Sequence, residues 1–331
     1  SVNLDVTSKY LNSHTSFFHQ EADSYQNNDK TIDKKGNELT TVDPLFVGFS
    51  SNIISQRLDF NPLKNLSFYA LGSYNYKVTD RPTPVEGLDG GSKYDLRSEG
   101  NRWEVGGKYN FGKHSVQLDF VNDNYHYGNL YRVESKPYKV GDFSRSKTQK
   151  YFDTELKGIF HFYDKGTTII GADWRNDFLN ATSGDVNNHV YTVAGYLQHD
   201  MEIVRNVSAT LGARYTHHGT FGNNFTPKVS LMYAPGDFRF RAAYSRGFRA
   251  PGLDELYYHY FKLMAGRPVI TFGNSNLESE KSHYASFSAE YSNRIFSLSV
   301  MGYMNFVKNM IVKENIAIND DNLQMLRREF P

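Results

Sequence analysis

Hydrophobic and polar residues alternate with a period of two along most of the chain. From residue 207 onward the apolar positions include Val207 and Leu211, and the polar positions between them include Ser208 and Arg214. The stretch that begins at Phe296 repeats the same order. A period of two is typical of β-strands whose two faces meet different surroundings. The pattern therefore predicts an all-β protein.

The predicted strands are joined by two kinds of connection. Short turn sequences such as Gly112-Lys113 and Pro235-Gly236-Asp237 alternate with long polar segments such as 81–100 and 128–146. We expect this alternation to hold without exception, because an up-and-down meander has its tight turns at one rim and its loops at the other. The strands number about 14.

The length of the predicted strands, and the lack of predicted helices to cover their apolar face, favour a membrane protein. Many runs have roughly 10 to 16 residues, and a tilted transmembrane strand needs roughly 9 to 11. Alternation alone also fits a soluble antiparallel sheet with one wet face. So many strands without helices, however, need a second sheet or lipid, and lipid lets polar residues such as Arg239 and Arg241 line a wet interior. Tyrosines stand near strand ends, where interfacial girdles belong: Tyr74, Tyr76, Tyr125, Tyr127, Tyr215 and Tyr244.

Composition agrees with a strand-rich protein and removes other classes. The 331 residues include 24 Tyr, 24 Phe and 26 Gly but no Cys, which suits aromatic pairs and tight turns rather than disulfides. Lys and Arg number 37 against 36 Asp and Glu, and no basic run interleaves with aromatics, so we expect no nucleic-acid partner. No apolar stretch reaches the roughly 20 residues of a membrane-spanning helix. The sequence therefore predicts an antiparallel up-and-down transmembrane β-barrel.

One long excursion between two strands, within 238–291, carries recognisable sequence blocks. They stand in fixed order as Phe248-Arg249-Ala250-Pro251, Glu255-Leu256-Tyr257, Gly273-Asn274-Ser275-Asn276-Leu277 and Glu280-Lys281-Ser282. Together with the preceding strand pair, these blocks resemble the signature loop of TonB-dependent outer-membrane receptors. Those receptors are plugged barrels that import scarce nutrients. The motif residues are Phe248, Arg249, Ala250, Pro251, Asn274, Asn276 and Leu277.

The resemblance implies a particular architecture and location. Receptors of this family close with 22 strands around a plug domain, so the chain is expected to be an incomplete barrel of about 14 strands without the plug. Residues 1–318 would form the partial barrel with long extracellular loops, and 319–331 a polar loop or short helix at a truncated end. The expected location is the bacterial outer membrane. The expected partners are outer-membrane lipid and lipopolysaccharide, the TonB complex through a plug outside this chain, and a surface lipoprotein over the loops.

A histidine between the blocks suggests a cargo. His259 stands in Tyr257-Tyr258-His259-Tyr260, and this arrangement resembles haem receptors of the family, in which a histidine between the two boxes supplies an axial imidazole. Imidazole suits iron, and flanking aromatics can stack on a porphyrin. The hypothesis is that His259 binds haem iron, that Tyr257, Tyr258 or Tyr260 lines the site, and that Arg249 touches the ligand.

The alternative is that these loop side chains only pack or form hydrogen bonds. Arg249 and Pro251 fit a structural role, because proline fixes φ and ends the strand, and 252–257 then forms a short helical turn. Ser275 and Ser279 stand where the family usually has proline. Siderophore and corrinoid receptors carry the same blocks, so the blocks identify the transporter better than its cargo.

The sequence gives little evidence for catalytic or metal-binding chemistry elsewhere. His217 and His218 are adjacent in a predicted strand, so they point to opposite faces and cannot both chelate one metal. Acidic residues occur singly along the predicted strands, and no nucleophile elbow, phosphate-binding loop or zinc motif is present. We therefore expect no enzyme and no intrinsic cofactor, with haem as a transported ligand.

The sequence thus favours a TonB-dependent importer of a scarce metal-containing nutrient. Haem, or haem from a haemoprotein, ranks ahead of a ferric siderophore or a corrinoid. A passive porin or an outer-membrane barrel enzyme is the rival from another class. A soluble β-sandwich that binds carbohydrate is the third possibility.

Overall fold

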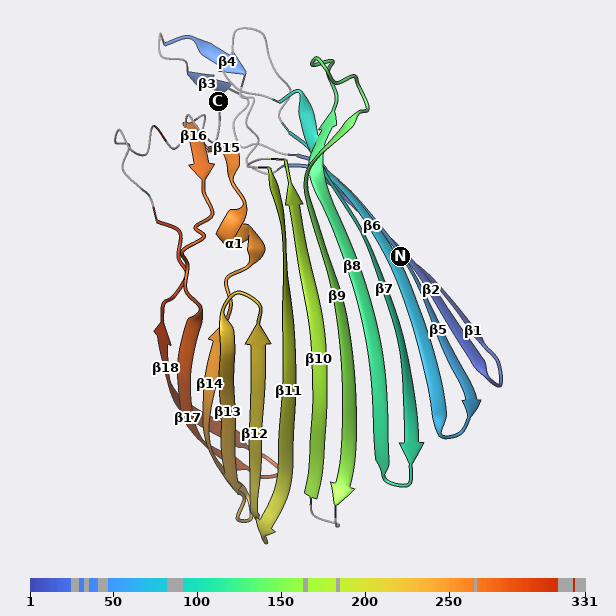
Figure 1. Ribbon diagram of the computed structural model, residues 1–331, viewed down its shortest axis with the longest axis vertical. Helices are drawn as coiled ribbons and strands as arrows, with labels where there is room; N and C mark the ends of the chain where they lie inside the picture. Colours follow the sequence, from blue (N-terminus) through green and yellow to red (C-terminus); the bar gives the residue numbers. More distant parts are fainter. Residues whose placement is uncertain are drawn as a thin grey trace.

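The computed structural model describes residues 1–24, 30–32, 36–40, 47–81, 92–162, 166–182, 185–264, 267–314 and 324. Within these residues, 14 strands form a single antiparallel sheet in which each strand pairs with the next one along the chain (Figure 1). The predicted strand number and the all-β fold are confirmed. The strands of the sheet are β1 (Val2–Thr7), β2 (Leu11–Ala22), β5 (Phe49–Leu63), β6 (Leu66–Thr79), β7 (Tyr94–Phe111), β8 (His114–Tyr131), β9 (Phe143–Phe162), β10 (Gly166–Ala181), β11 (Val186–Val204), β12 (Val207–His218), β13 (Gly222–Tyr233), β14 (Phe238–Arg249), β17 (Glu280–Ser292) and β18 (Ser297–Lys308).

Two small hairpins and one short helix lie outside this sheet. They are β3 (Lys30–Ile32) with β4 (Glu38–Thr40), β15 (Tyr260–Met264) with β16 (Arg267–Thr271), and α1 (Leu253–Tyr257). Figure 1 shows these elements toward the end of the sheet opposite the tight turns, with α1 beside the upper part of β10 and β11. In the described part of the chain, no helix is both long and apolar enough to cross a membrane.

The strand register sorts the side chains onto two different faces. Leu197 pairs with Ala213 on one face, which we call the apolar face, whereas Tyr196 pairs with Arg214 on the other, which we call the polar face. On the apolar face, Leu118 and Leu156 remain about half exposed, at 52% and 51%. No described helix or second sheet covers them. Exposed leucines in a continuous band are expected where strands face lipid.

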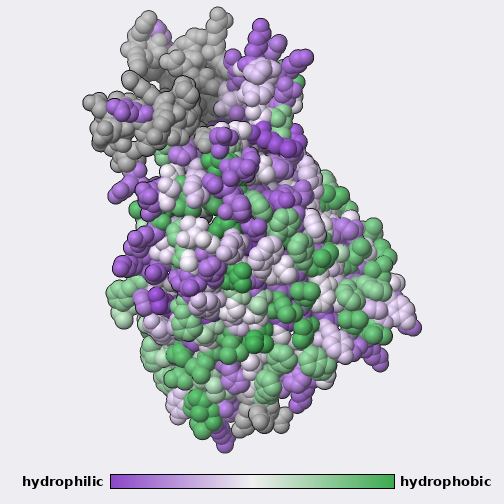
Figure 2. Space-filling model, in the orientation of Figure 1, coloured by the Kyte–Doolittle hydropathy of each residue, from purple (hydrophilic) through white to green (hydrophobic). Residues whose placement is uncertain are grey.

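The hydrophobic band covers only part of the strand length. Figure 2 shows hydrophobic residues gathered over the lower part of the sheet and hydrophilic residues over the upper part, toward the hairpins. The sheet therefore has an apolar zone near its turns and a hydrophilic zone near its loops. This division is typical of a membrane barrel whose loops extend into water.

One prediction about the connections is wrong. At the loop end, β12 and β13 are joined by residues 219–221 alone, so tight and long connections do not alternate without exception. Gly222 has a φ of +66°, which permits a tight reversal that a residue with a side chain disfavours. The expected long segment 128–146 is also shorter than predicted, because β8 and β9 continue their pairing into it as far as Leu130 and Phe143.

The extended hairpin of β8 and β9 is held by aromatic and charged contacts. The rings of Tyr131 and Tyr138 stack with centroids 4.4 Å apart. Arg132 donates a 2.7 Å hydrogen bond to the carbonyl of Arg81 and lies 3.2 Å from the buried carboxylate of Asp95. The hairpin therefore stands above the sheet as an ordered extension, shown in green at the top of Figure 1.

Candidate ligand-binding loop and polar face

The excursion after β14 begins with a short helix, as the sequence predicts. Pro251 is buried and ends the strand, and α1 follows after Gly252. The carboxylate of Glu255 turns back and accepts a 2.8 Å hydrogen bond from the backbone N–H of Gly252. This bond satisfies one of the free N–H groups at the helix start. Leu256 is buried at 3% exposure, so the turn is anchored by packing as well.

Arg249 links the sequence blocks to one another. One guanidinium nitrogen donates to Glu255 at 2.6 Å, and the other lies 3.3 Å from Glu280, the first residue of β17. The strand end, the helix and the returning strand are therefore joined through one side chain. This geometry fits the structural role considered for Arg249 in the sequence. Contact of Arg249 with a ligand stays a prediction.

The block Gly273–Leu277 folds back onto the helix. Gly273 donates from its N–H to the carbonyl of Tyr258 at 3.1 Å, and Asn274 donates to the carbonyl of Glu255 at 2.8 Å. A Cβ atom on Gly273 would lie 2.7 Å from the backbone of Leu256, so only glycine fits this approach. The Asn274 side chain accepts from the N–H of Asn276 and shapes the turn. The blocks therefore dock on each other in the folded loop.

Other residues of the sequence blocks take part in strand pairing and in a turn. Phe248 lies in β14, where it pairs with Lys281 of β17 on the apolar face. Leu277 donates from its N–H to the carbonyl of Asn274 at 3.2 Å and is half-buried. Of the two serines that replace the usual prolines, Ser275 is exposed and Ser279 is buried.

The helix covers the polar face at the loop end of β10 and β11. Leu253, Tyr257 and Tyr258 pack against a small buried cluster formed by Leu179, Ala181 and Val186. Next to this cluster, Lys147 lies 3.5 Å from Asp254 and 5.0 Å from the ring centroid of Tyr258. Tyr257 and Tyr258 thus have packing roles. Their exposed portions keep them candidates for lining a ligand site.

His259 lies just beyond the helix, where it is half-buried against Phe272. The two rings meet edge to face with centroids 5.3 Å apart. Among the described residues, the buried Nδ1 of His259 has no hydrogen-bond partner. No group of three or more His, Cys, Asp or Glu in the described ranges is arranged to hold a metal ion. The side chain of Tyr260 lies outside the described residues, and the haem-iron role of His259 stays a prediction.

The two adjacent histidines at the loop end of β12 diverge as expected. His217 contacts Asn223 at 2.7 Å and Tyr191 at 3.3 Å on the apolar face. His218 is buried, and its Nδ1 accepts from the N–H of Thr220 at 3.2 Å. Each has its own local partners, and the pair forms no shared site.

Directly below the helix, the polar face carries a group of arginines around one tyrosine. Arg102 donates to the hydroxyl of Tyr151 at 2.9 Å, and Arg175 lies over the same ring at 4.0 Å from its centroid. Arg175 also donates two hydrogen bonds to Asp177. We call Arg102, Tyr151 and Arg175 the arginine–tyrosine group. In this group, two guanidinium groups contact the same tyrosine side chain.

This charged face contains a pattern that sequence reasoning missed. Arginine pairs with an acid two residues later at four places on three strands, β5, β7 and β10, and side chains two apart lie on one face. Three of the pairs lie on the polar face, Arg57–Asp59, Arg102–Glu104 and Arg175–Asp177, and the fourth, Arg97–Glu99, lies on the apolar face. The spacing was visible in the sequence and would have identified paired charges. Arg239 and Arg241, expected to face a wet interior, both reach Glu290 on the polar face, at 2.9 and 3.3 Å.

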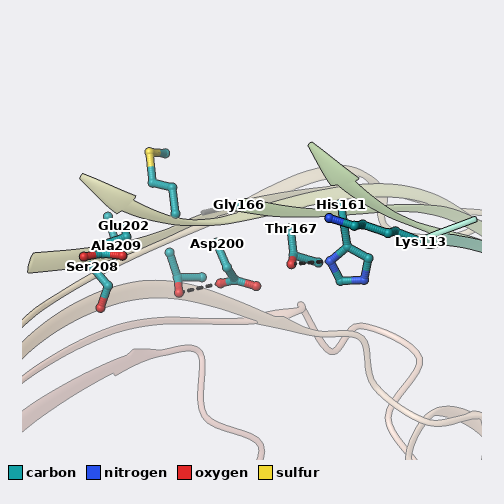
Figure 3. A pocket seen from close by; sticks show the side chains of 10 residues that line it. Lys113, His161, Gly166, Thr167, Asp200, Glu202, Ser208 and Ala209 are labelled. Atoms are coloured by element: carbon teal, nitrogen blue, oxygen red, sulfur yellow. Dashed lines mark hydrogen bonds between the residues drawn. The ribbon is translucent and has the colours of Figure 1, made fainter. Parts of the chain in front are cut away.

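A separate cavity of about 530 Å³ lies at the opposite end of the sheet, near the tight turns (Figure 3). His161 and Thr167 share a 2.9 Å hydrogen bond on its wall, and Thr210 donates to Asp200 at 2.6 Å. The cavity is lined mainly by polar atoms of β9 to β12 and by Lys113. It shares no residue with the sequence blocks, so the loop and this cavity are two different places on the polar face.

The open sheet, the exposed apolar band and the charged second face together are typical of an outer-membrane β-barrel. The model of the family described as TonB dependent receptor-like, beta-barrel, matches residues 7–324. The chain therefore belongs to the TonB-dependent receptor β-barrel family, and its place is the bacterial outer membrane. The resemblance of the sequence blocks to this family is confirmed.

Two curated relatives have lower similarity and shorter overlap. The ferrienterobactin receptor of Escherichia coli K12 is 20% identical over 220 residues, covering 55% of this chain and 30% of that protein. The ferric enterobactin receptor PirA of Pseudomonas aeruginosa is 25% identical over 201 residues, covering 51% of this chain and 27% of that protein. The chain therefore spans less than a third of the length of these relatives.

Solved structures share the fold. A mutant of the ferric enterobactin receptor of Pseudomonas aeruginosa superimposes with a TM-score of 0.75 at 15% identity, covering 93% of this chain and 50% of that one. The copper transporter OprC superimposes with a TM-score of 0.66 at 10% identity, covering 93% and 51%. Because receptors named for different cargoes share this barrel, the fold alone does not select a cargo.

Proposed function

We propose that this chain is barrel sequence of a TonB-dependent receptor that imports a ferric siderophore of the enterobactin kind. The observation that carries the proposal is that the ferrienterobactin receptor and PirA match half of the chain in sequence. The siderophore alternative therefore replaces haem as the first choice of cargo. The relatives are transport receptors, which supports the expectation that the protein is not an enzyme.

The chemistry of the polar face fits such a cargo. A ferric catecholate complex carries negative charge and flat aromatic rings, and arginine and tyrosine side chains bind both features. The arginine–tyrosine group presents two guanidinium groups, each about two-fifths exposed, around the ring of Tyr151. It lies below α1 at the loop end, which in outer-membrane barrels faces the outside. We infer that this group takes part in capture of the complex.

The test is ligand binding to the receptor expressed from its complete gene. Ferric enterobactin, a ferric hydroxamate and haem are each titrated while tryptophan fluorescence and the haem Soret band are recorded. We expect saturable binding of the catecholate complex, and about tenfold weaker binding in Arg175→Gln, because a charged hydrogen bond is lost. Arg239→Gln, near the turn end of the same face, is the matched control. Absence of catecholate binding to the unmodified receptor would overturn the proposal.

Haem remains a second candidate because of one observation. The buried Nδ1 of His259 lacks a hydrogen-bond partner among the described residues, and the ring packs against Phe272. If the protein binds haem through this imidazole, addition of haem shifts the Soret band and His259→Ala abolishes the shift. An identical spectrum for the parent and the variant removes His259 as a ligand.

Energy coupling is tested separately from cargo. A TonB-dependent importer requires the inner-membrane energy machinery for uptake but not for ligand binding, whereas a passive porin conducts without either ligand or energy. We expect uptake of iron-labelled siderophore to stop in a strain without TonB while surface binding continues. Ligand-independent conductance in planar bilayers would favour the porin alternative.

A further inference from the structure

The apolar face becomes basic above its leucine band. On β7, Arg97 lies on the same face as Trp103, six residues nearer to the turn. On β9, Lys150 shares the face of Leu156, and Arg145 pairs in register with Gly128 opposite Arg97. Six residues of extended strand span roughly 20 Å. Arg97 therefore lies roughly 20 Å beyond Trp103, and Lys150 roughly the same distance beyond Leu156, both toward the loop end of the sheet.

Aromatic rings hold these cations in place. Arg97 lies between the rings of Tyr76 and Phe143, at 4.9 and 4.4 Å from their centroids. Arg145 lies 5.9 Å from the centroid of the same Phe143 ring. Such cation–π contacts orient a guanidinium and leave its edge available for other partners. We call Arg97, Arg145 and Lys150 the basic belt.

Lys150 extends the basic belt along β9. Its ammonium lies 4.4 Å from the ring centroid of Phe152 and 5.7 Å from that of Phe178. A lysine stem that runs along apolar rings while its charge reaches upward is the arrangement found at membrane interfaces. The aromatic residues around the belt mark the level of the headgroups.

The belt has more positive than negative charge. Glu99 is the one carboxylate in direct contact with it among the described residues, with Arg97 at 2.5 Å and Arg145 at 3.7 Å. Two of the three cations, Arg97 and Arg145, thus share one anion. The Nε of Arg97 is buried without a hydrogen-bond partner in the described structure, and the Arg145 side chain is 57% exposed. The exposed guanidinium of Arg145 is therefore available to donate to an anion located at the surface.

We propose that the basic belt binds the phosphate groups of lipopolysaccharide in the outer leaflet. In an outer-membrane barrel the loop end faces outward, and the leaflet there is built from this phosphorylated glycolipid. Guanidinium groups bind phosphate through paired hydrogen bonds, and lysine contributes a point charge. The belt lies on the lipid-facing side, whereas α1, which carries one of the sequence blocks, packs on the polar face. The inference therefore does not depend on which siderophore the receptor carries.

The experiment compares two double variants of the receptor expressed from its complete gene. Arg145→Gln with Lys150→Gln removes two charges from the belt, and Lys108→Gln with Lys228→Gln removes two charges from the polar face. Lipopolysaccharide retained after detergent purification is counted by native mass spectrometry. We expect the belt variant to retain at least about fivefold less, because each basic residue near an anionic surface contributes a factor of about five. The polar-face variant should retain the normal amount.

Binding of purified glycolipid then separates the possible ligands. Stripped receptor in detergent is titrated with lipopolysaccharide, with dephosphorylated lipopolysaccharide and with inorganic phosphate. We expect tight binding only of the phosphorylated glycolipid. Equal binding of the dephosphorylated form, competition by inorganic phosphate at the same concentration as lipopolysaccharide, or equal retention by both variants would overturn the proposal.

A charge-conserving variant is the control for misfolding. Arg145→Lys should retain most of the lipopolysaccharide, whereas a loss equal to that of Arg145→Gln would count against an electrostatic site. Ferric siderophore binding is recorded for every variant and should remain at the level of the parent. Normal siderophore binding with lost lipopolysaccharide supports the belt independently of the proposed cargo.

Discussion

The two faces of the same strands are stabilised in different ways. On the apolar face, Leu118 and Leu156 lie in a band whose favourable term is contact with lipid. On the polar face, Arg175 is held by a carboxylate on its own strand and Arg214 by a carboxylate two strands away. One face therefore depends on the absence of charge and the other on its pairing. A substitution should have opposite consequences on the two sides of a single strand pair.

The largest effect is expected for a charge placed in the apolar band. Leu156→Arg puts a guanidinium near the middle of the hydrophobic zone, and an arginine at the bilayer midplane destabilises a barrel by about 2–4 kcal/mol. The free energy of unfolding is measured by urea titration of the complete receptor in phosphocholine bilayers. A loss below about 1 kcal/mol would contradict the assignment of this face to lipid.

The control for this prediction lies on the other face of the neighbouring strand. Val121 pairs with Glu104 on one side and with Asp153 on the other. Val121→Arg therefore places the same charge among acids and is expected to change the free energy of unfolding by less than about 1 kcal/mol. Equal losses for Leu156→Arg and Val121→Arg would remove the distinction between the faces.

The next largest effect is expected where the loop crosses onto the polar face. Gly273→Ala introduces a Cβ atom 2.7 Å from the Leu256 backbone, and this clash is expected to weaken the docking of the block onto α1 by about 1–3 kcal/mol. Hydrogen exchange of the 252–277 amides should accelerate while the strands keep their protection. Gly252→Ala is the control, because its nearest atoms are 3.4 Å away. Unchanged exchange in Gly273→Ala would show that the block does not depend on this approach.

Most of the sheet was predictable from sequence because its determinants are local. A period of two fixes which residues share a face, and Pro251 followed by the helical turn at 252–257 is a local effect of fixed φ. The contact of Gly273 with Leu256 was not predictable in the same way, because it joins residues far apart in the loop. The environment of His259 depends on Phe272 for the same reason.

The short β12–β13 connection shows a different limit of prediction from the sequence. Residues 219–224 contain Gly219, Gly222 and Asn223, a composition that indicates a connection between strands. The strands continue their pairing to Gly222, because its positive φ allows the reversal within three residues. Polar composition identifies a connection but not its length. The arginine–acid pairs at a spacing of two were local and were legible in the sequence.

A smaller effect is expected for a paired charge on the polar face. Arg214 donates to Asp173 at 2.9 Å, and the Asp173 side chain is only 14% exposed. Arg214→Ala leaves this carboxylate without its cation, but the guanidinium is 40% exposed and solvent screens the pair, so we expect about 1 kcal/mol. The double variant Arg214→Ala with Asp173→Ala should recover part of the loss. Additive losses would show that the pair is not coupled.

The smallest effect is expected at the turn end of the same face. Arg239 and Arg241 both reach Glu290, but their side chains are 45% and 50% exposed. Glu290→Gln is therefore expected to change the free energy of unfolding by about 0.5 kcal/mol or less, because exposed pairs gain little in water and are screened by salt. The titration is repeated in about 1 M salt, where the screening distance falls to about 3 Å and the difference should vanish. A loss above about 1 kcal/mol that persists in salt would mean that these arginines are buried against another part of the receptor, and the polar face would then be stabilised at both ends in the same way.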